Sequence, residues 1–466
     1  MNLWQVRKGG ATTSAPTEGE THAARQPVIT DASPGDIHAQ SDRLLGMKVR
    51  IHQQLLDRVN LSALDKLPRA EIAEQISVII NEILLEDGEV LNKAERAALA
   101  NDVLDELLGL GPLEPLLKDE TITDILVNGY RTVFVERHGL LEKVPTRFQD
   151  ERHLQRIIQK IVSAVGRRID ESSPFVDARL EDGSRVNAII APLAIDGSLL
   201  SIRKFSKKPI SMARMIELGS IPRQVADILK AIVAARFNVI ISGGTGSGKT
   251  TMLNALSSYI DPRERIVTIE DSAELQLQQD HVARLETRPP NIEGRGEVTQ
   301  RDLVKNALRM RPDRIILGEC RSGEAFDMLQ AMNTGHDGSM TTIHANSPRD
   351  ALSRIEQMVG MSGIDIPTRS VRAQIASAIH IVLQIARLSD GKRKMISLSE
   401  LTGMEGDTIT MQEIYRFHMS GRDADGNVLG HFEPSGIRPR FAAQLEAHGI
   451  RLDAQLFRPD TRLEAK

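Results

Sequence analysis

Hydrophobic residues recur with a helical period in the early part of the chain. Within residues 69–85 the apolar positions lie three or four apart, and residues 93–108 repeat this spacing. A further helix is expected around Leu55. Three such helices predict a small bundle, which is either a packing module or a docking module for a partner. The apolar positions that define the first two helices are Ile72, Ile76, Ile79 or Ile80, Ile83, Leu99, Val103 and Leu107.

The pattern becomes mixed between residues 122 and 206. Residues 132–136 have the β-branched and aromatic content of a strand, and residues 151–165 have the apolar spacing of a helix. Two short runs, 177–180 and 185–189, flank the turn sequence Glu-Asp-Gly-Ser, which is typical of a β-hairpin. We therefore expect an α+β domain in this part of the chain.

Strands and helices alternate from residue 221 to about residue 438. Short apolar runs indicate buried strands, and amphipathic segments between them indicate helices. This alternation predicts an α/β domain with a doubly wound parallel sheet. Residues 379–387 and 395–400, joined through Asp390 and Gly391, predict a terminal hairpin. The expected strands are 237–241, 266–269, 314–317 and 340–343, and the expected helices lie near 301–310 and 322–334.

Three other segments are assigned as connections or tails. Residues 1–47 are rich in Ala, Thr, Ser, Pro and Gly, which predicts a disordered tail, with a short amphipathic anchor as the alternative. Residues 209–220 are expected to form a linker, because Pro209 and Gly219 mark its two ends. Residues 441–466 are expected to form a C-terminal tail.

Composition narrows the class of protein. The 466 residues are enough for two or three domains, and a net charge of −4 gives no basic field that would favour nucleic acid. The single cysteine, Cys320, excludes an intrachain disulfide framework and a tetracysteine zinc site, and it fits a reducing compartment. No stretch approaches the ~20 apolar residues of a membrane span. We expect a cytoplasmic protein that docks on a membrane through a partner.

Residues Gly243 to Thr250, with the sequence GGTGSGKT, match the phosphate-binding pattern G-x-x-x-x-G-K-[ST]. They lie between an apolar strand and a helical segment, as this chemistry requires. The glycines let backbone N–H groups surround a phosphate, Lys249 would reach the β- and γ-phosphates, and the Thr250 hydroxyl would hold Mg²⁺. The sequence thus predicts a site for ATP and Mg²⁺ formed by Gly243, Gly244, Thr245, Gly246, Ser247, Gly248, Lys249, Thr250 and Thr251.

Two acidic groups follow neighbouring strands. Glu319 ends the strand at 314–317 as an atypical Walker B motif, since Gly318 stands where an aspartate is usual, and it joins Thr250 as a candidate metal ligand. Glu270 and Asp271 end the strand at 266–269. Both sets should share the carboxyl edge of a parallel sheet. Glu319 and Glu270 compete for the role of orienting or activating water, and a solvated acid is the alternative for each.

Histidines and arginines supply further candidates. His336 and His344 lie on either side of the strand at 340–343, and His344 is the stronger candidate for a γ-phosphate sensor. A metal ligand or a hydrogen-bonded core histidine is the alternative. Positive charge at the transition state is expected from Arg185 and Arg203, brought in by domain closure. Arg284 and Arg288 are second choices, and a surface ion pair is the alternative for any of these arginines.

The order of these motifs resembles the secretion ATPases of type II and type IV secretion and of pilus assembly. The phosphate loop, IEDSAEL, RMRPDRIILGE and TGHDGSMTTIHAN correspond in that family to the Walker A motif, Asp box, Walker B motif and His box. SRVNAIIAPL followed by SIRKF resembles the domain that precedes the phosphate loop. The helical segment and the amino-acid sequence around RMRPDRIILGECRSGEAF look most similar to the CpaF-type ATPase of tight-adherence (Flp/Tad) pili.

The resemblance implies an architecture and a task. It implies a PAS-like α+β domain at 111–208 and a RecA-like ATPase domain at 221–440, with ATP bound between them, after the helical bundle expected at 48–110. It further implies a homohexamer that works on the cytoplasmic face of the inner membrane with a membrane platform protein; direct nucleic-acid binding is not expected, given the net charge. The rivals are a DNA-handling conjugation ATPase, disfavoured by an aromatic content of 3%, and a nucleotide-gated scaffold with little hydrolysis.

Overall fold

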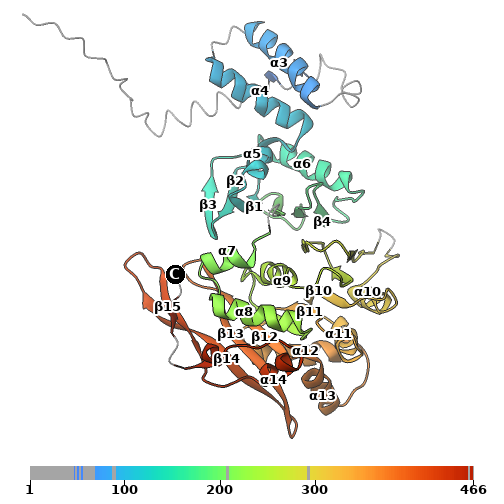
Figure 1. The fold of residues 1–466 in the computed structure, drawn as a ribbon. Helices are drawn as coiled ribbons and strands as arrows, with labels where there is room; N and C mark the ends of the chain where they lie inside the picture. Colours follow the sequence, from blue (N-terminus) through green and yellow to red (C-terminus); the bar gives the residue numbers. More distant parts are fainter. Residues whose placement is uncertain are drawn as a thin grey trace, which may run out of the picture. The chain divides into compact units, whose positions relative to one another are not determined.

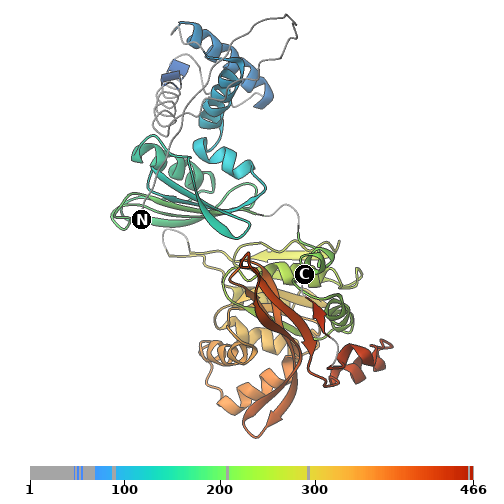
Figure 2. The ribbon, with the colours of Figure 1, turned by 90° about the vertical axis from the view of Figure 1, so that its left-hand side faces the viewer.

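The structure is a computed structural model, and the chain divides into two compact units, Met1–Leu107 and Leu108–Lys466. Figures 1 and 2 show the chain coloured along its sequence. Apart from Met47, the tail expected at 1–47 lies outside the described residues. None of the described helices is long and apolar enough to cross a membrane. The described residues are 47, 50, 51, 54, 55, 69–86, 91–205, 209–290, 294–459 and 462–464.

The first unit contains the two helices that the apolar spacing predicts. Helix α3 spans Arg69–Glu86 and buries Ile76, Ile80 and Ile83. Helix α4 spans Lys93–Leu108 and buries Leu99 and Val103. Asn92 and Glu95 cap α4 reciprocally, each backbone N–H donating to the other side chain at 2.9 Å. Most of the helix expected around Leu55 lies outside the described residues, although Leu55 itself is helical and buried.

The next part, residues 111–205, is the expected α+β domain. Its six-stranded sheet has the order β3-β2-β1-β6-β5-β4, and neighbouring strands run antiparallel. Helix α6 begins after Asp150, whose side chain accepts a hydrogen bond from the His153 N–H, and it buries its apolar face in the domain core. The elements are η1 Gly111–Leu113, α5 Glu114–Lys118, β1 Ile122–Asn128, β2 Thr132–Arg137, β3 Leu140–Val144, α6 Glu151–Ala164, β4 Phe175–Arg179, β5 Arg185–Ile189 and β6 Leu199–Arg203.

The remaining residues, 209–464, form the α/β domain around a ten-stranded sheet of order β16-β15-β14-β13-β12-β7-β11-β10-β8-β9. Strands from β12 to β9 pair in parallel, and β12 to β16 pair antiparallel. The elements are α7 Met212–Glu217, α8 Arg223–Ala234, β7 Val239–Gly243, α9 Lys249–Ser257, β8 Ile266–Glu270, β9 Val282–Glu286, α10 Gln300–Ala307, β10 Arg314–Cys320, α11 Glu324–Asn333, β11 Met340–Ile343, α12 Pro348–Gly360, α13 Thr368–Ala378, β12 Ile381–Arg387, β13 Arg393–Glu405, β14 Thr408–Arg422, β15 Val428–Pro434, α14 Phe441–Ala447, η2 Ala454–Phe457 and β16 Leu463–Glu464.

Helices cover the two faces of this sheet, as Figure 1 shows for α8 and for α11 to α13. Alternate residues of the buried strand β7 point to opposite faces. Val239 and Ile241 pack with α7, α8 and α9, whereas Ile240 packs with α10 to α13. The predicted fold class is therefore confirmed: a RecA-like α/β domain follows an α+β domain, with helices at the N-terminal side of the chain.

Two segments differ from the prediction. The expected linker at 209–220 contains α7, which buries Met212 and Met215 in the core of the α/β domain. The expected tail at 441–466 contains α14, which buries Phe441 and Leu445, and β16, which pairs with β15. These segments are too short to show a periodic apolar pattern, so long-range burial decides their structure. The hairpin expected as terminal also continues into β14 and β15, which Figure 2 shows in red.

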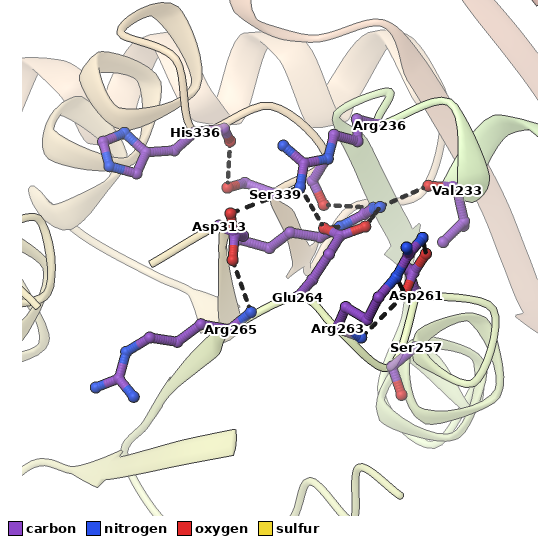
Figure 3. Close-up of polar contacts among 12 residues, drawn as sticks. Val233, Arg236, Ser257, Asp261, Arg263, Glu264, Arg265, Asp313, His336 and Ser339 are labelled. Atoms are coloured by element: carbon purple, nitrogen blue, oxygen red, sulfur yellow. Dashed lines mark hydrogen bonds and ion pairs between the residues drawn. The ribbon is translucent and has the colours of Figure 1, made fainter. Parts of the chain in front are cut away.

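A buried guanidinium, that of Arg314, lies at the amino end of the parallel sheet. Figure 3 shows Glu264, Val233 and Arg236, which surround it. The Arg314 side chain, at the start of β10, is 0% exposed. Its Nε and Nη2 donate to the two carboxylate oxygens of Glu264 at 2.6 and 2.9 Å, and Nη2 also donates to the Val233 carbonyl at 2.9 Å. Arg236 lies 3.1 Å from the same carboxylate and 3.6 Å from Asp313. One charge cluster thus ties β10 to α8 and to the segment before β8.

Glu264→Gln is expected to lower the free energy of unfolding by about 3–5 kcal/mol, because it leaves the buried Arg314 charge without its paired anion. Denaturant unfolding of the full chain measures this change. Glu356→Gln is the control, since it removes the partner of a more exposed arginine, Arg372, at 2.9 Å. Equal stability of the two variants would contradict the inference.

Candidate functional site

The phosphate-binding sequence forms a tight loop between β7 and α9. All five residues of β7 are buried, and the chain turns through left-handed conformations at Gly246 (φ +67°) and Gly248 (φ +94°) before α9 begins. A Cβ atom on Gly243 would lie 2.5 Å from both the Ile385 carbonyl oxygen and the Ser247 hydroxyl. Glycine is therefore required at these positions for steric and conformational reasons.

Lys249 lies at the inside of this loop. Its Nζ donates to the carbonyl oxygens of Gly243 and Gly244, each at 3.0 Å. Burial lowers the pKa of the Lys249 ammonium, and the negative charge of Glu319 partly offsets that effect. The loop is held closed by a further bond from the Ser247 hydroxyl to the Gly244 carbonyl at 2.8 Å. A half-buried ammonium beside glycine N–H groups and a helix N-terminus fits a polyphosphate.

The parallel pairing brings the candidate carboxylates to the same edge of the sheet. The sheet places four parallel strands side by side in the order β7, β11, β10 and β8. Glu270 ends β8, Glu319 lies near the end of β10, and His344 follows β11, so all three lie at the edge where the loop leaves β7. The β10–β11 register slips between Leu317 and Cys320, so one extra residue of β10 faces β11. Such a bulge redirects side chains beside it. The bulge contains Gly318 and Glu319, the two residues that make the Walker B motif atypical.

Glu270 is buried, with 3% of its surface exposed. One carboxylate oxygen, Oε2, accepts hydrogen bonds from the N–H groups of Glu274 and Leu275 at 2.7 and 2.8 Å. The other oxygen, Oε1, has no hydrogen-bond partner among the described residues. Burial raises the pKa of the Glu270 carboxyl, and the two N–H donors oppose that rise. A Cβ on Gly318 would lie 2.9 Å from Glu270, so the glycine at the bulge leaves room for this carboxylate.

Glu319 is more exposed and is paired with an arginine that the sequence analysis missed. Arg321 Nη2 donates to the Glu319 carboxylate at 2.6 Å, and Nη1 lies 3.3 Å from Asp271. Arg321 therefore joins the ends of β10 and β8. Its position two residues after Glu319 was visible in the sequence, but a basic residue after a strand carries no specific signal by itself.

Arg185 and Arg203 line one cavity with the first turns of α9. Arg185 lies 3.0 Å from the Glu274 carboxylate and donates to the Ser272 carbonyl at 3.0 Å, whereas Arg203 pairs with Asp124 at 3.1 Å. The cavity has a volume of about 220 Å³. Arg179, which the sequence analysis did not single out, donates to the Ser272 hydroxyl at 2.8 Å. The residues lining the cavity include Arg185, Arg203, Thr250, Thr251, Asn254, Glu274 and Gln276.

The remaining candidates differ in position. Arg288 Nε donates to the Gly296 carbonyl at 2.7 Å, and Arg288 lines a larger cavity of about 1140 Å³ that Arg185 and Arg203 also line. Arg284 lies on β9. Its positive charge lowers the pKa of Glu270 and so opposes the rise that burial causes. His336 precedes β11 at the amino edge, where its carbonyl accepts from Ser339 (Figure 3). It therefore lies at the opposite end of the strand from His344.

The candidate metal ligands at this edge of the sheet are oxygen atoms. Among the described residues, no group of three or more His, Cys, Asp or Glu side chains could hold a metal ion. Thr250 at the start of α9 and Glu319 at the end of β10 offer a hydroxyl and a carboxylate, the hard ligands that suit Mg²⁺ when phosphate oxygens complete its shell.

Comparisons with solved structures find an ATPase of a type IV secretion system and a pilus retraction motor. The VirB11 ATPase of the Brucella suis type IV secretion system is 27% identical, with 62% of this chain and 95% of that chain covered and a TM-score of 0.34. The pilus retraction motor PilT is 19% identical, with 61% and 80% covered and a TM-score of 0.46.

Sequence relatives carry names from conjugal transfer and type IV secretion. A Mycobacterium tuberculosis protein named for conjugal transfer is 39% identical, covering 65% of this chain and 87% of its own length. The type IV secretion system protein PtlH of Bordetella pertussis is 35% identical, with 62% and 92% covered. The conjugal transfer protein TrbB of Rhizobium radiobacter is 31% identical, with 59% and 83% covered.

The family model described as "Type II/IV secretion system protein" matches residues 106–424, which is more than half of the chain. The superfamily inferred from the ordered motifs is thereby confirmed, and closeness to the tight-adherence pilus branch stays a prediction. The chain therefore belongs to the family of type II/IV secretion system proteins.

Proposed function

We propose that this protein is a Mg²⁺-dependent ATPase motor that drives a pilus or secretion machine. The observation that carries the proposal is Lys249, half-buried inside a glycine loop at the sheet edge where Glu270 and Glu319 also lie. Phosphoryl transfer needs positioned positive charge, a metal and an oriented water. The site offers groups for each of these tasks.

The residues at this edge have different proposed roles in binding phosphate, metal and water. Lys249 and the loop N–H groups bind the β- and γ-phosphates. Thr250 and Glu319 would hold Mg²⁺, which would supply further positive charge beside the phosphates. Glu270 is assigned to orient and activate the attacking water, because its buried Oε1 is unpaired among the described residues. The raised pKa that burial gives this carboxyl also suits a general base. His344 is assigned to sense the γ-phosphate.

The cavity at the start of α9 is assigned to the rest of the nucleotide. Thr250 and Thr251 lie beside the loop, and Arg185 and Arg203 enter the same cavity from the α+β domain. In this protein both guanidinium groups already have acidic partners, Glu274 and Asp124. We propose that nucleotide phosphates compete with these carboxylates, so that charge stabilisation depends on the arrangement of the α+β domain.

The assembly and the machine extend this proposal. We propose that residues 48–110 form a docking bundle and residues 111–208 a PAS-like domain. The motor domain is the α/β domain that follows, including α7 (Met212–Glu217) and α14 (Phe441–Ala447). We propose a homohexamer on the cytoplasmic face of the inner membrane, with a membrane platform protein of a tight-adherence pilus as its partner. The conjugal-transfer names of two relatives favour a second candidate, a conjugation-type ATPase that handles DNA.

Lys249→Ala is expected to abolish ATP hydrolysis and to weaken nucleotide binding strongly, because the phosphates lose their point charge. Phosphate release and calorimetric titration with ADP measure the two effects. Arg372→Ala, which removes a more distant arginine of the same domain, serves as the control. Turnover of the Lys249 variant at the unmodified rate would refute the proposed site.

Glu270→Gln is expected to lower kcat by about a hundredfold or more with little change in ATP binding, since it removes the base. The raised pKa predicts that kcat of the unmodified protein falls with acid at a higher pH than an ordinary glutamate would give. Glu319→Gln should instead increase the Mg²⁺ concentration needed for activity. If Glu319→Gln alone lowers kcat at saturating Mg²⁺, the two roles are reversed.

Light scattering with a nonhydrolysable ATP analogue is expected to show a hexamer, because a motor of this family needs contacts that close a ring. Removal of residues 48–107 should impair pilus assembly more than basal hydrolysis. A monomer at every concentration would contradict the ring. Stimulation of hydrolysis by duplex DNA, and not by the membrane partner, would favour the conjugation-type candidate.

A further inference from the structure

Two arginines face each other at the end of the β12–β13 hairpin. The register pairs Arg387 of β12 directly with Arg393 of β13. Like charges at directly opposite positions destabilise a sheet unless an anion compensates them. The turn between them contains Asp390, whose carboxylate accepts hydrogen bonds from the N–H groups of Lys392 and Val428 and pairs with the Lys392 ammonium at 4.0 Å rather than with either arginine. The arginine pair therefore needs another counter-charge.

Both guanidinium groups lie against the phosphate loop. Arg393 Nε donates to the Gly246 carbonyl at 3.0 Å. The same side chain lies 3.5 Å from the position that a Cβ on Gly248 would take, and Arg387 Nη1 lies 3.7 Å from the corresponding position on Gly246. The arginines thus contact the two loop glycines that adopt left-handed conformations. Their charge and their hydrogen bond act on the part of the loop that surrounds phosphate.

Glu136 supplies the counter-charge from the α+β domain. Its two carboxylate oxygens lie 3.9 Å from Arg387 Nη1 and 3.8 Å from Arg393 Nη2, and its side chain is 18% exposed. Arg387 also donates to the carbonyl of Gly139, in the turn that follows β2. One carboxylate therefore lies within ion-pair distance of both arginines, and a second contact holds Arg387 in place beside it.

We propose that Arg387, Arg393 and Glu136 form a charge brace through which the α+β domain sets the affinity of the phosphate loop for nucleotide. The brace has two positive charges and one negative charge, so Glu136 reduces the positive potential at the loop. Movement of Glu136 away from the arginines strengthens phosphate binding, and its return weakens it. Arg393 additionally fixes the Gly246 carbonyl. This inference rests on the proposed nucleotide site and adds a positioning role for residues outside its motifs.

The brace predicts opposite effects for its two charges. Glu136→Gln keeps the side-chain shape and removes the negative charge, so it should tighten binding of ADP and of tripolyphosphate by about fivefold or more. Arg393→Gln removes a positive charge and the bond to Gly246, so it should weaken binding by a similar factor. A residue with only a structural role would weaken binding in both cases. The difference should shrink at high salt, because these side chains are partly exposed.

Calorimetric titration of the full chain with ADP and with tripolyphosphate tests this inference without turnover. Glu136→Asp, which keeps the charge, should bind as the unmodified protein does, and Arg372→Gln controls for loss of a distant partly exposed arginine. If Glu136→Gln and Arg393→Gln shift affinity in the same direction, or neither shifts it, the brace is wrong. If the unmodified protein binds neither ligand, the proposed nucleotide site is refuted, and the charge brace is refuted together with it.

Discussion

The architecture depends on a full positive charge that is buried where the parallel strands begin. Arg314 is placed in the core, where an unpaired guanidinium is strongly unfavourable, so the chain must bring an anion to it. Glu264, held just before β8, meets it with two hydrogen bonds, and the end of α8 contributes the Val233 carbonyl. This requirement fixes β10 relative to β8 and α8. From there β8 and β10 stay in parallel register up to Ile269 and Leu317, so the same pairing leads to the edge where Glu270 and Glu319 lie.

The carboxyl edge shows the opposite arrangement, in which charges are buried without full compensation. Burial lowers the pKa of Lys249 and raises the pKa of Glu270, so each group is less stable in its charged form than in water. A ligand with phosphate oxygens and a bound water would satisfy both. Titratable groups with opposed shifts at one edge are the pattern expected of a site that does chemistry. The two ends of the sheet thus differ: the Arg314 cluster is fully paired, whereas the carboxyl edge, where we propose the nucleotide site, is not.

The parts of the proposed site that sequence motifs could indicate are those contiguous in the chain. The phosphate loop, Glu270 and Glu319 follow strands, and their motifs carry the spacing that the chemistry needs. Arg387, Arg393 and Glu136 could not be found in this way, because their proximity to Gly246 arises from pairing of β12 with β7 and from contact with another domain. The core position of α14 could not be predicted for the same reason. Its Phe441 and Leu445 are buried by residues distant in the sequence, and the short segment alone does not show this.

The α+β domain contacts the site through two independent sets of charges. Arg179 and Arg185 donate to Ser272, in the loop that follows Glu270, while Glu136 lies beside the arginines that contact Gly246. One set acts on the segment that gives Glu270 its two N–H donors, and the other acts on the phosphate loop. A rigid domain cannot shift at one contact without changing the other. Under the proposed function, these two contacts would link binding at the loop to the orientation of Glu270, which is the coupling that a motor requires if nucleotide state is to become domain movement.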